Sequence, residues 1–143
     1  MIEYQKILDK NMLNVFKDIL KSIKDNGLSN NNHLYITFLT NNRNVELPNW
    51  LKQKYPQEMT IIIQYEYYDL EINKNNFSIT LSFGDIKTNL KIDYSAIVSF
   101  ADPSANFGLI LQKNNIKKKV NKKLESNKSK KDNVINFSNY KKN

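Results

Sequence analysis

The stretch FSITLSFGDIKTNLKI, residues 77–92, decides the fold of this 143-residue chain. Apolar side chains occupy every second position from Phe77 to Phe83, which is the period-two pattern of a half-buried strand. Gly84-Asp85 suits a tight reversal. The apolar residues after the reversal share one parity, namely Ile86, Leu90 and Ile92. The stretch therefore predicts an antiparallel β-hairpin with one apolar face.

Three further segments on either side of this hairpin have the composition of strands. HLYITFLT at 33–40 combines β-branched and aromatic residues, and FGLIL at 107–111 is a short apolar run. MTIIIQYEYYDLEI at 59–72 is rich in Ile and Tyr, and we expect it to form one long or bulged strand. Because the connections are too short for repeated parallel crossovers, the sheet is expected to be antiparallel and curled toward a small barrel.

Helical patterns lie before and between these segments. Residues 3–26 carry apolar side chains at spacings of three and four and end at Gly27. Their apolar stripe is broad, so it suits either a helix lying on its own sheet or one that also contacts a second chain. Pro48 begins a short helix, and Asp93 caps another that we expect to run through Phe100. The predicted fold class is α+β, mainly antiparallel β, with the N-terminal helix packed on the sheet.

Charge divides the chain into a folded domain, residues 1–112, and a tail. Residues 113–143 hold eleven lysines and two carboxylates, a net charge of +9, whereas residues 1–112 have a net charge of −1. The tail has too few large apolar side chains to offset the entropy of folding, so we expect a flexible linker at 113–131. Apolar and aromatic residues gather within 132–143, which predicts a docking segment anchored by Val134, Ile135, Phe137 and Tyr140.

The residue types that enzymes use are scarce. The chain has no cysteine, which excludes disulfides, thiolate metal sites and cysteine nucleophiles. Its three glycines cannot form a dinucleotide fingerprint or a phosphate-binding loop. His33 lacks a Ser or Cys constellation, and the carboxylates Glu66, Asp69 and Glu71 fit solvated or edge-protecting charge. We therefore expect no catalysis, no metal and no cofactor.

Two binding functions remain for such a chain. Lysines in the tail and the tyrosines at 65, 67 and 68 suit RNA binding by a small barrel with a basic arm, but the slightly acidic domain disfavours nucleic acid. The other function is peptide binding, because a strand edge pairs with an extended peptide. The N-terminus has no leader pattern and no stretch approaches about 20 apolar residues, so we expect a cytoplasmic protein without membrane contact.

Four segments of the chain resemble one known family. They are HLYITFLT at 33–40, LKQKYPQEMTIIIQYEYYDL at 51–70, FSITLSFGDI at 77–86 and SAIVSFADPSANFGL at 95–109. In this order and spacing they resemble the SspB family, and particularly its alphaproteobacterial branch. That family consists of adaptors that deliver ssrA-tagged, incompletely synthesised proteins to the ClpXP protease. The resemblance covers nearly the whole folded part of the chain.

The resemblance implies a specific assignment of roles. An Sm-like antiparallel sheet would bind the tag as an extended peptide, and matching positions assign to it Gln64, Glu66, Leu81, Phe83, Gly84, Ala101 and Asp102. The closest branch forms homodimers through the N-terminal helix, here through the stripe that includes Val15, Phe16 and Ile19. The end of the family's tail docks on ClpX, which is the role implied for Val134, Ile135, Phe137 and Tyr140.

Overall fold

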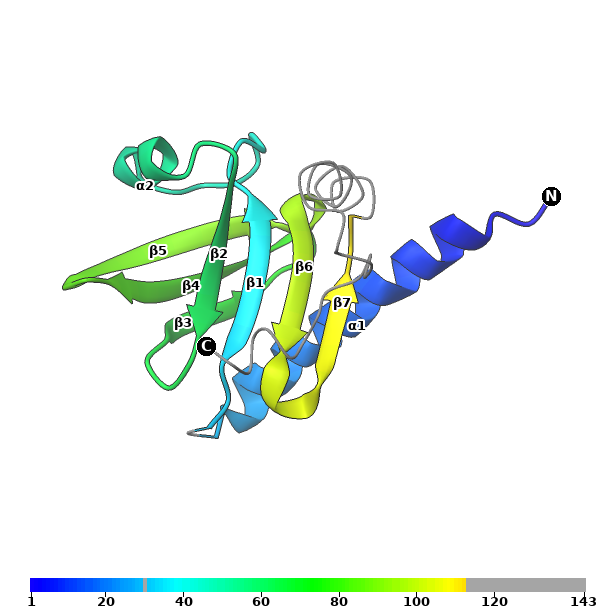
Figure 1. Cartoon of the computed structure of the whole chain (residues 1–143), viewed down its shortest axis with the longest axis horizontal. Coiled ribbons are helices and arrows are strands. Elements are labelled where there is room, and N and C mark those ends of the chain that lie inside the picture. The colour runs from blue at the N-terminus through cyan, green and yellow to red at the C-terminus, as the bar shows by residue number, and fades with distance from the viewer. Residues whose placement is uncertain (30, 113–143) are drawn as a thin grey trace, which may run out of the picture.

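The computed structural model describes residues 1–29 and 31–112, which form one long helix and two antiparallel sheets (Figure 1). One sheet has the strand order β2-β1-β6-β7, and the other has the order β3-β4-β5. The two sheets do not close into one barrel, and the α+β class is confirmed. The elements are α1 (Tyr4–Asn26), β1 (Leu34–Leu39), α2 (Asn49–Lys54), β2 (Glu58–Ile63), β3 (Tyr68–Ile72), β4 (Asn76–Phe83), β5 (Ile86–Asp93), β6 (Ile97–Asp102) and β7 (Phe107–Ile110).

The predicted hairpin is present as β4 and β5. These strands pair in continuous register from Asn76 with Asp93 to Phe83 with Ile86. Gly84 lies in the turn with φ 64°, a conformation that glycine adopts at little cost because it has no Cβ. The apolar face of the hairpin supplies the three-stranded sheet's part of the core, namely Phe77, Ile79, Leu81, Leu90 and Ile92. The sequence pattern therefore placed both the strands and their buried face correctly.

The segment 59–72 is not one strand, as its sequence suggested. It forms β2 in the four-stranded sheet and β3 in the three-stranded sheet, with residues 64–67 as the connection. Asp69 has φ 54°, and the pairing of β3 with β4 shifts between Tyr68 and Glu71, as in a bulge. The high density of Ile and Tyr on both sides of the connection hid this change of sheet.

The helix expected from Asp93 through Phe100 is also a correction. Asp93 accepts a hydrogen bond from the Ser95 amide (2.9 Å), but this caps only one 3₁₀ turn, Tyr94–Ala96. The chain then continues as β6, which pairs with β1 on one side and β7 on the other. Because β6 is central and buried on both faces, its continuous apolar run resembled a buried helix segment.

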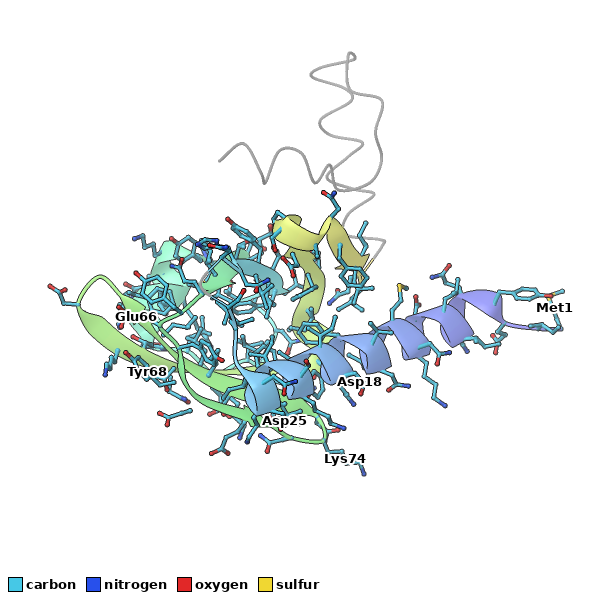
Figure 2. All side chains as sticks on the ribbon, turned by 90° about the horizontal axis from the view of Figure 1, so that it is seen from below. Met1, Asp18, Asp25, Glu66, Tyr68 and Lys74 are labelled. Atoms are coloured by element: carbon cyan, nitrogen blue, oxygen red, sulfur yellow. The ribbon has the colours of Figure 1, made fainter. Side chains whose placement is uncertain are left out.

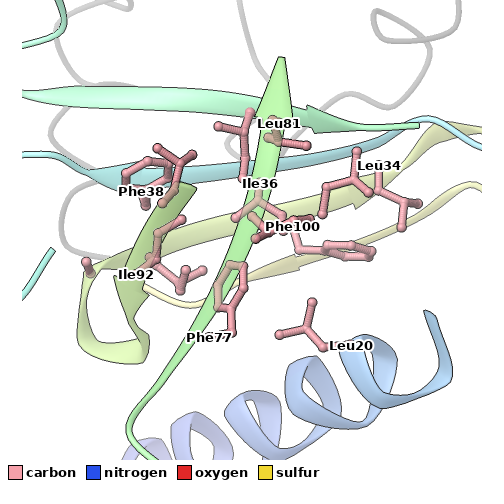
Figure 3. Close-up of a cluster of buried hydrophobic side chains, with 14 of the residues drawn as sticks. Leu20, Leu34, Ile36, Phe38, Phe77, Leu81, Ile92 and Phe100 are labelled. Atoms are coloured by element: carbon pink, nitrogen blue, oxygen red, sulfur yellow. The ribbon is translucent and has the colours of Figure 1, made fainter. Parts of the chain in front are cut away.

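Helix α1 closes the core with the C-terminal half of its length (Figure 3). Phe16, Leu20 and Ile23 are buried, and the Phe16 ring meets Phe77 and Phe100 edge to face at centroid distances of 5.9 and 6.0 Å. Phe16 is 0% exposed. The Phe16 ring thus belongs to the core of its own domain and exposes no surface in the single chain, while the dimer contact through Val15 and Ile19 stays a prediction.

Tyr94 ties the 3₁₀ turn to this aromatic cluster. Its ring stacks on Phe77 at 6.2 Å, and its hydroxyl donates to the Asn73 carbonyl (2.9 Å). The Lys17 ammonium lies 4.6 Å from the ring centroid. Burial raises the pKa of the Tyr94 hydroxyl above its usual value, because the charged form loses solvation there.

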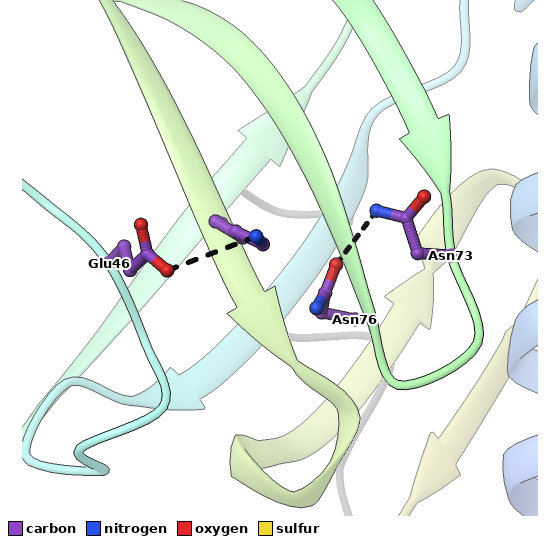
Figure 4. A network of polar contacts seen from close by, with 4 residues as sticks. Glu46, Asn73 and Asn76 are labelled. Atoms are coloured by element: carbon purple, nitrogen blue, oxygen red, sulfur yellow. Dashed lines mark hydrogen bonds and ion pairs between the residues drawn. The ribbon is translucent and has the colours of Figure 1, made fainter.

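Polar contacts lie at the edge of β5 and at the turn between β3 and β4 (Figure 4). Glu46 and Lys91 exchange main-chain hydrogen bonds of 2.8 and 3.1 Å, and their side chains approach to 3.9 Å. Asn73 donates to Asn76 (2.8 Å) across the turn between β3 and β4. The contacts of Glu46 therefore occupy part of the edge of β5. None of the helices within residues 1–29 and 31–112 is long and apolar enough to cross a membrane.

Candidate peptide-binding edge

The distal end of the hairpin carries apolar side chains that the core does not cover. Phe83 and Ile86 have the parity of the buried hairpin residues, so they point to the core-facing side of the sheet. Ile86 is nevertheless 58% exposed and Phe83 is only half-buried. In Figure 1 the distal half of β4 and β5 extends beyond β2, on the side away from β1. An apolar surface thus continues past the end of the core.

Helix α2 borders this surface. Trp50, the single tryptophan of the chain, packs edge to face on Phe83 with ring centroids 6.2 Å apart, yet it is 41% exposed. The next residue, Leu51, is buried and fixes α2 to the core. Thr40 in turn holds the end of α2, since its hydroxyl donates to the Tyr55 carbonyl. We call the exposed surface of Trp50, Phe83 and Ile86 the hairpin shelf.

The free edge of β2 presents main-chain hydrogen-bonding groups of known identity. The Thr40 amide donates to the Gln57 carbonyl (3.0 Å), and bonded pairs alternate along an antiparallel ladder. The main chains of Met59, Ile61 and Ile63 therefore face β1, whereas those of Thr60 and Ile62 face away from it. Within residues 1–29 and 31–112 no strand lies on that outer side. An unpaired edge of this kind is a template for an extended peptide.

The connection 64–67 lies at the other end of β2 and carries two of the residues assigned by the resemblance. Gln64 is half-buried, and Glu66 is exposed. Figure 2 shows Glu66 and Tyr68 on the side of the molecule away from Met1. The Lys87 ammonium lies 4.2 Å from the centroid of the Tyr68 ring, a cation–π contact between β5 and β3. In the sequence, Gln64 and Glu66 thus come directly after β2, and Trp50 comes before it.

The other assigned residues divide into two groups. Phe83 is part of the shelf and Gly84 follows it in the hairpin turn, whereas Leu81 is only 4% exposed and packs in the core. Ala101 and Asp102 belong to β6, which β1 separates from β2. Ala101 is 2% exposed, and Asp102 accepts from Ser104 (2.7 Å) and Asn32 (3.4 Å) in the turn before β7. The fold therefore does not bring Ala101 and Asp102 to the hairpin shelf.

A second uncovered apolar surface lies on α1. Its N-terminal half projects from the sheets in Figures 1 and 2 and exposes Tyr4, Leu8 and Val15. Met12 and Ile19 lie on the same side of the helix and are half-buried. We call these five residues the helix stripe. The stripe runs from Ile19, near the core contact of Phe16, to Tyr4 in the part of α1 that neither sheet covers.

Residues for metal or acid–base chemistry do not converge in the described part of the chain. His33 is exposed just before β1. Among residues 1–29 and 31–112, no group of three or more His, Asp or Glu side chains is placed to hold a metal ion.

Comparison with known families gives this arrangement a context. The profile of SspB, stringent starvation protein B, matches residues 6–142. The chain belongs to the SspB family. The match includes α1 from Lys6 onward, both sheets and most of the lysine-rich tail. SspB membership supports a protease-adaptor kind of role with a protein as partner. A search of curated proteins found no significant match.

Sequence reasoning missed Trp50, Ile86 and the outward groups of Thr60 and Ile62. The alternation in 77–92 identified the face on which Ile86 lies, but not where the covering sheet ends. The sequence did contain a signal for Trp50. A helix of six residues buries few side chains, so a large aromatic residue next to the apolar Leu51 is expected to stay partly exposed.

Proposed function

We propose that this protein is a non-enzymatic cytoplasmic adaptor that binds an ssrA-type tag as an extended strand along β2 and delivers the tagged protein to ClpX. The observation that carries the proposal is the coincidence of two features. The main-chain groups of Thr60 and Ile62 face an unpaired edge, and the apolar hairpin shelf extends beyond that same edge. A strand added there has partners both for its main chain and for alternate side chains.

The expected affinity is moderate. Thr60 and Ile62 together offer two amides and two carbonyls, and each main-chain hydrogen bond contributes only about 1 kcal/mol net. Covering the shelf adds roughly 25 cal/mol for each Å² of apolar surface removed from water, and the loss of peptide freedom offsets part of both terms. Specific side-chain contacts at the two ends of the edge complete the site, and we assign them to Gln64, Glu66, Phe83 and Gly84.

Delivery then depends on linkage rather than on tight binding. We assign residues 113–131 as the linker and residues 132–143 as the ClpX-docking segment, with Val134, Ile135, Phe137 and Tyr140 as its anchors. A flexible linker converts the second contact into an intramolecular one, which raises apparent affinity on the order of a hundredfold without a new contact. The SspB match supports this division because it extends through the tail to residue 142.

We also propose that two copies associate through the helix stripe. Tyr4, Leu8 and Val15 expose apolar surface on a part of α1 that no sheet covers, and a second α1 offers the same surface. A homodimer doubles the number of docking segments per adaptor. This arrangement strengthens attachment to an oligomeric partner by avidity.

Fluorescence anisotropy with a labelled ssrA peptide, beside a labelled RNA of similar length, tests the function. We expect saturable binding of the peptide that changes little between low and high salt, because main-chain pairing and apolar contact carry it. Binding of the RNA alone, with steep weakening as salt rises, would instead assign the protein to phosphate recognition by its basic tail.

A further inference from the structure

We propose that the docking segment of this protein, residues 132–143, also occupies the hairpin shelf and the free edge of β2 in the absence of a tag, so that it competes with the substrate. This inference rests on the proposed function of the same site. Its occupant is a named part of the chain itself, and the consequence is regulatory. A protease that takes up the segment also frees the site for the tag.

The site's chemistry selects an extended segment with spaced apolar side chains. Thr60 and Ile62 direct main-chain groups outward, and Trp50 and Ile86 keep large apolar surfaces exposed. The sequence NVINFSNY at 133–140 has four apolar or aromatic residues within eight, without proline or glycine to interrupt a strand. It therefore has the features that β2 and the shelf require of a ligand.

The length of the tail allows the segment to reach this site. The last described residues lie beside β6, where the amides of Leu111 and Gln112 donate to the Val98 carbonyl. From β7 to β2 the four-stranded sheet spans three strand spacings, which is about 14 Å at ~4.8 Å each. A flexible chain with the length of the linker, residues 113–131, has a root-mean-square span of about 24 Å at ~5–6 Å per square root of residue number. The distance to be spanned is shorter than this root-mean-square span, so the linker need not stretch.

Charge does not oppose return of the tail to its own domain. The tail carries +9 and the domain −1, and the elements around the site hold Lys52, Lys54 and Lys87 as well as Glu66 and Asp85. The tethered segment has an effective concentration on the order of millimolar, so even millimolar intrinsic affinity occupies about half of the sites. A free tag of higher affinity still displaces it. Occupancy thus lowers apparent tag affinity without blocking the site.

Trp50 reports this occupancy without any added ligand, because it is the only tryptophan and lies on the shelf. Acrylamide quenching of its fluorescence would be compared between the full chain and the full-length Ile135→Asp/Phe137→Asp variant. We expect quenching of the variant to be about twofold more efficient, since the shelf is open. Val120→Asp, a matched change in the tail outside the segment, should quench like the unaltered chain. Equal quenching in all three proteins would overturn the inference.

A second measurement separates this inference from the proposed function. Labelled ssrA peptide should bind the Ile135→Asp/Phe137→Asp variant about twofold to tenfold more tightly than it binds the unaltered chain. A synthetic peptide of residues 132–143 should displace the label from the variant. Equal affinities would contradict the competition while leaving tag binding intact. If no protein binds the ssrA peptide but quenching still differs, the proposed substrate is wrong and the intramolecular contact stands.

Discussion

The proximal and distal halves of the β4–β5 hairpin have the same sequence pattern but different surroundings. Phe77 and Ile92, near α1, are fully buried, whereas Phe83 and Ile86, at the tip, face the same side of the sheet and remain partly open. The difference arises because the four-stranded sheet ends at β2. An exposed apolar face that continues past the end of the core is typical of a surface that binds another chain.

Helix α1 repeats this contrast along its length. Phe16, Leu20 and Ile23 fill the core, while Tyr4 and Leu8 continue an apolar surface into the projecting half. Substitutions on the covered side of each boundary should therefore change stability, and substitutions on the open side should change association. The following predictions use that difference, from the largest expected effect to the smallest.

Neighbouring residues of α1 should respond in opposite ways to aspartate. Phe16→Asp leaves a cavity and an unpaired charge in the core, so we expect a loss on the order of 5 kcal/mol and an unfolded protein by circular dichroism. Val15→Asp should keep the fold but shift sedimentation toward the monomer. A folded Phe16→Asp protein, or a Val15→Asp protein that remains dimeric, would contradict the boundary drawn at this point of the helix.

The two halves of the hairpin should separate stability from binding. Phe77→Ala is expected to lower the free energy of unfolding by about 3–5 kcal/mol in urea titrations. Ile86→Asp should alter it by no more than about 0.5 kcal/mol, as is usual at exposed positions, yet weaken ssrA peptide binding about tenfold. Ser82→Asp, on the opposite face of β4, serves as the matched control. Equal binding by the Ile86 and Ser82 variants would show that the shelf does not contact the peptide.

The main chain of β2 can be tested with proline. Thr60→Pro removes an outward amide that no strand pairs, so the fold should persist while peptide affinity falls by about tenfold, or ~1.4 kcal/mol. Thr60→Val keeps the amide and loses the same side-chain hydrogen bond to Thr37 (2.7 Å), so it should bind the peptide normally. If both variants bind with the same affinity by anisotropy, the peptide does not pair with β2 at Thr60.

The smallest expected effect concerns alkaline pH. Since burial raises the pKa of Tyr94 in the folded state, folding favours the neutral hydroxyl. This stabilisation is complete below the unfolded pKa of about 10 and is lost as pH rises through the higher folded value. Denaturant midpoints should therefore fall more steeply above about pH 10 in the unaltered protein than in Tyr94→Phe. Identical slopes would mean that Tyr94 does not govern the alkaline loss.

Local pattern was sufficient for the hairpin and for the bounds of α1, where a clear period ends at a turn or capping residue, and composition was sufficient for β1 and β7. It was insufficient for 59–72, where Ile and Tyr alternate irregularly with polar residues, and for 97–100, which is almost entirely apolar. Neither segment has a clear period, so the partner strands decide the outcome. The same reason limits prediction of the site. Whether Ile86 or Leu81 is exposed depends on where β2 ends in space, and no local signal in the hairpin contains that information.

Amide hydrogen exchange by NMR, with and without the ssrA peptide, tests the central claim most directly. If the peptide pairs with β2, the amides of Thr60 and Ile62 should exchange markedly more slowly when it is bound. Those of Met59 and Ile61, already bonded toward β1, should change little. Protection that appears along β7 instead, with Thr60 and Ile62 unchanged, would contradict the assignment of the peptide to the β2 edge and the hairpin shelf.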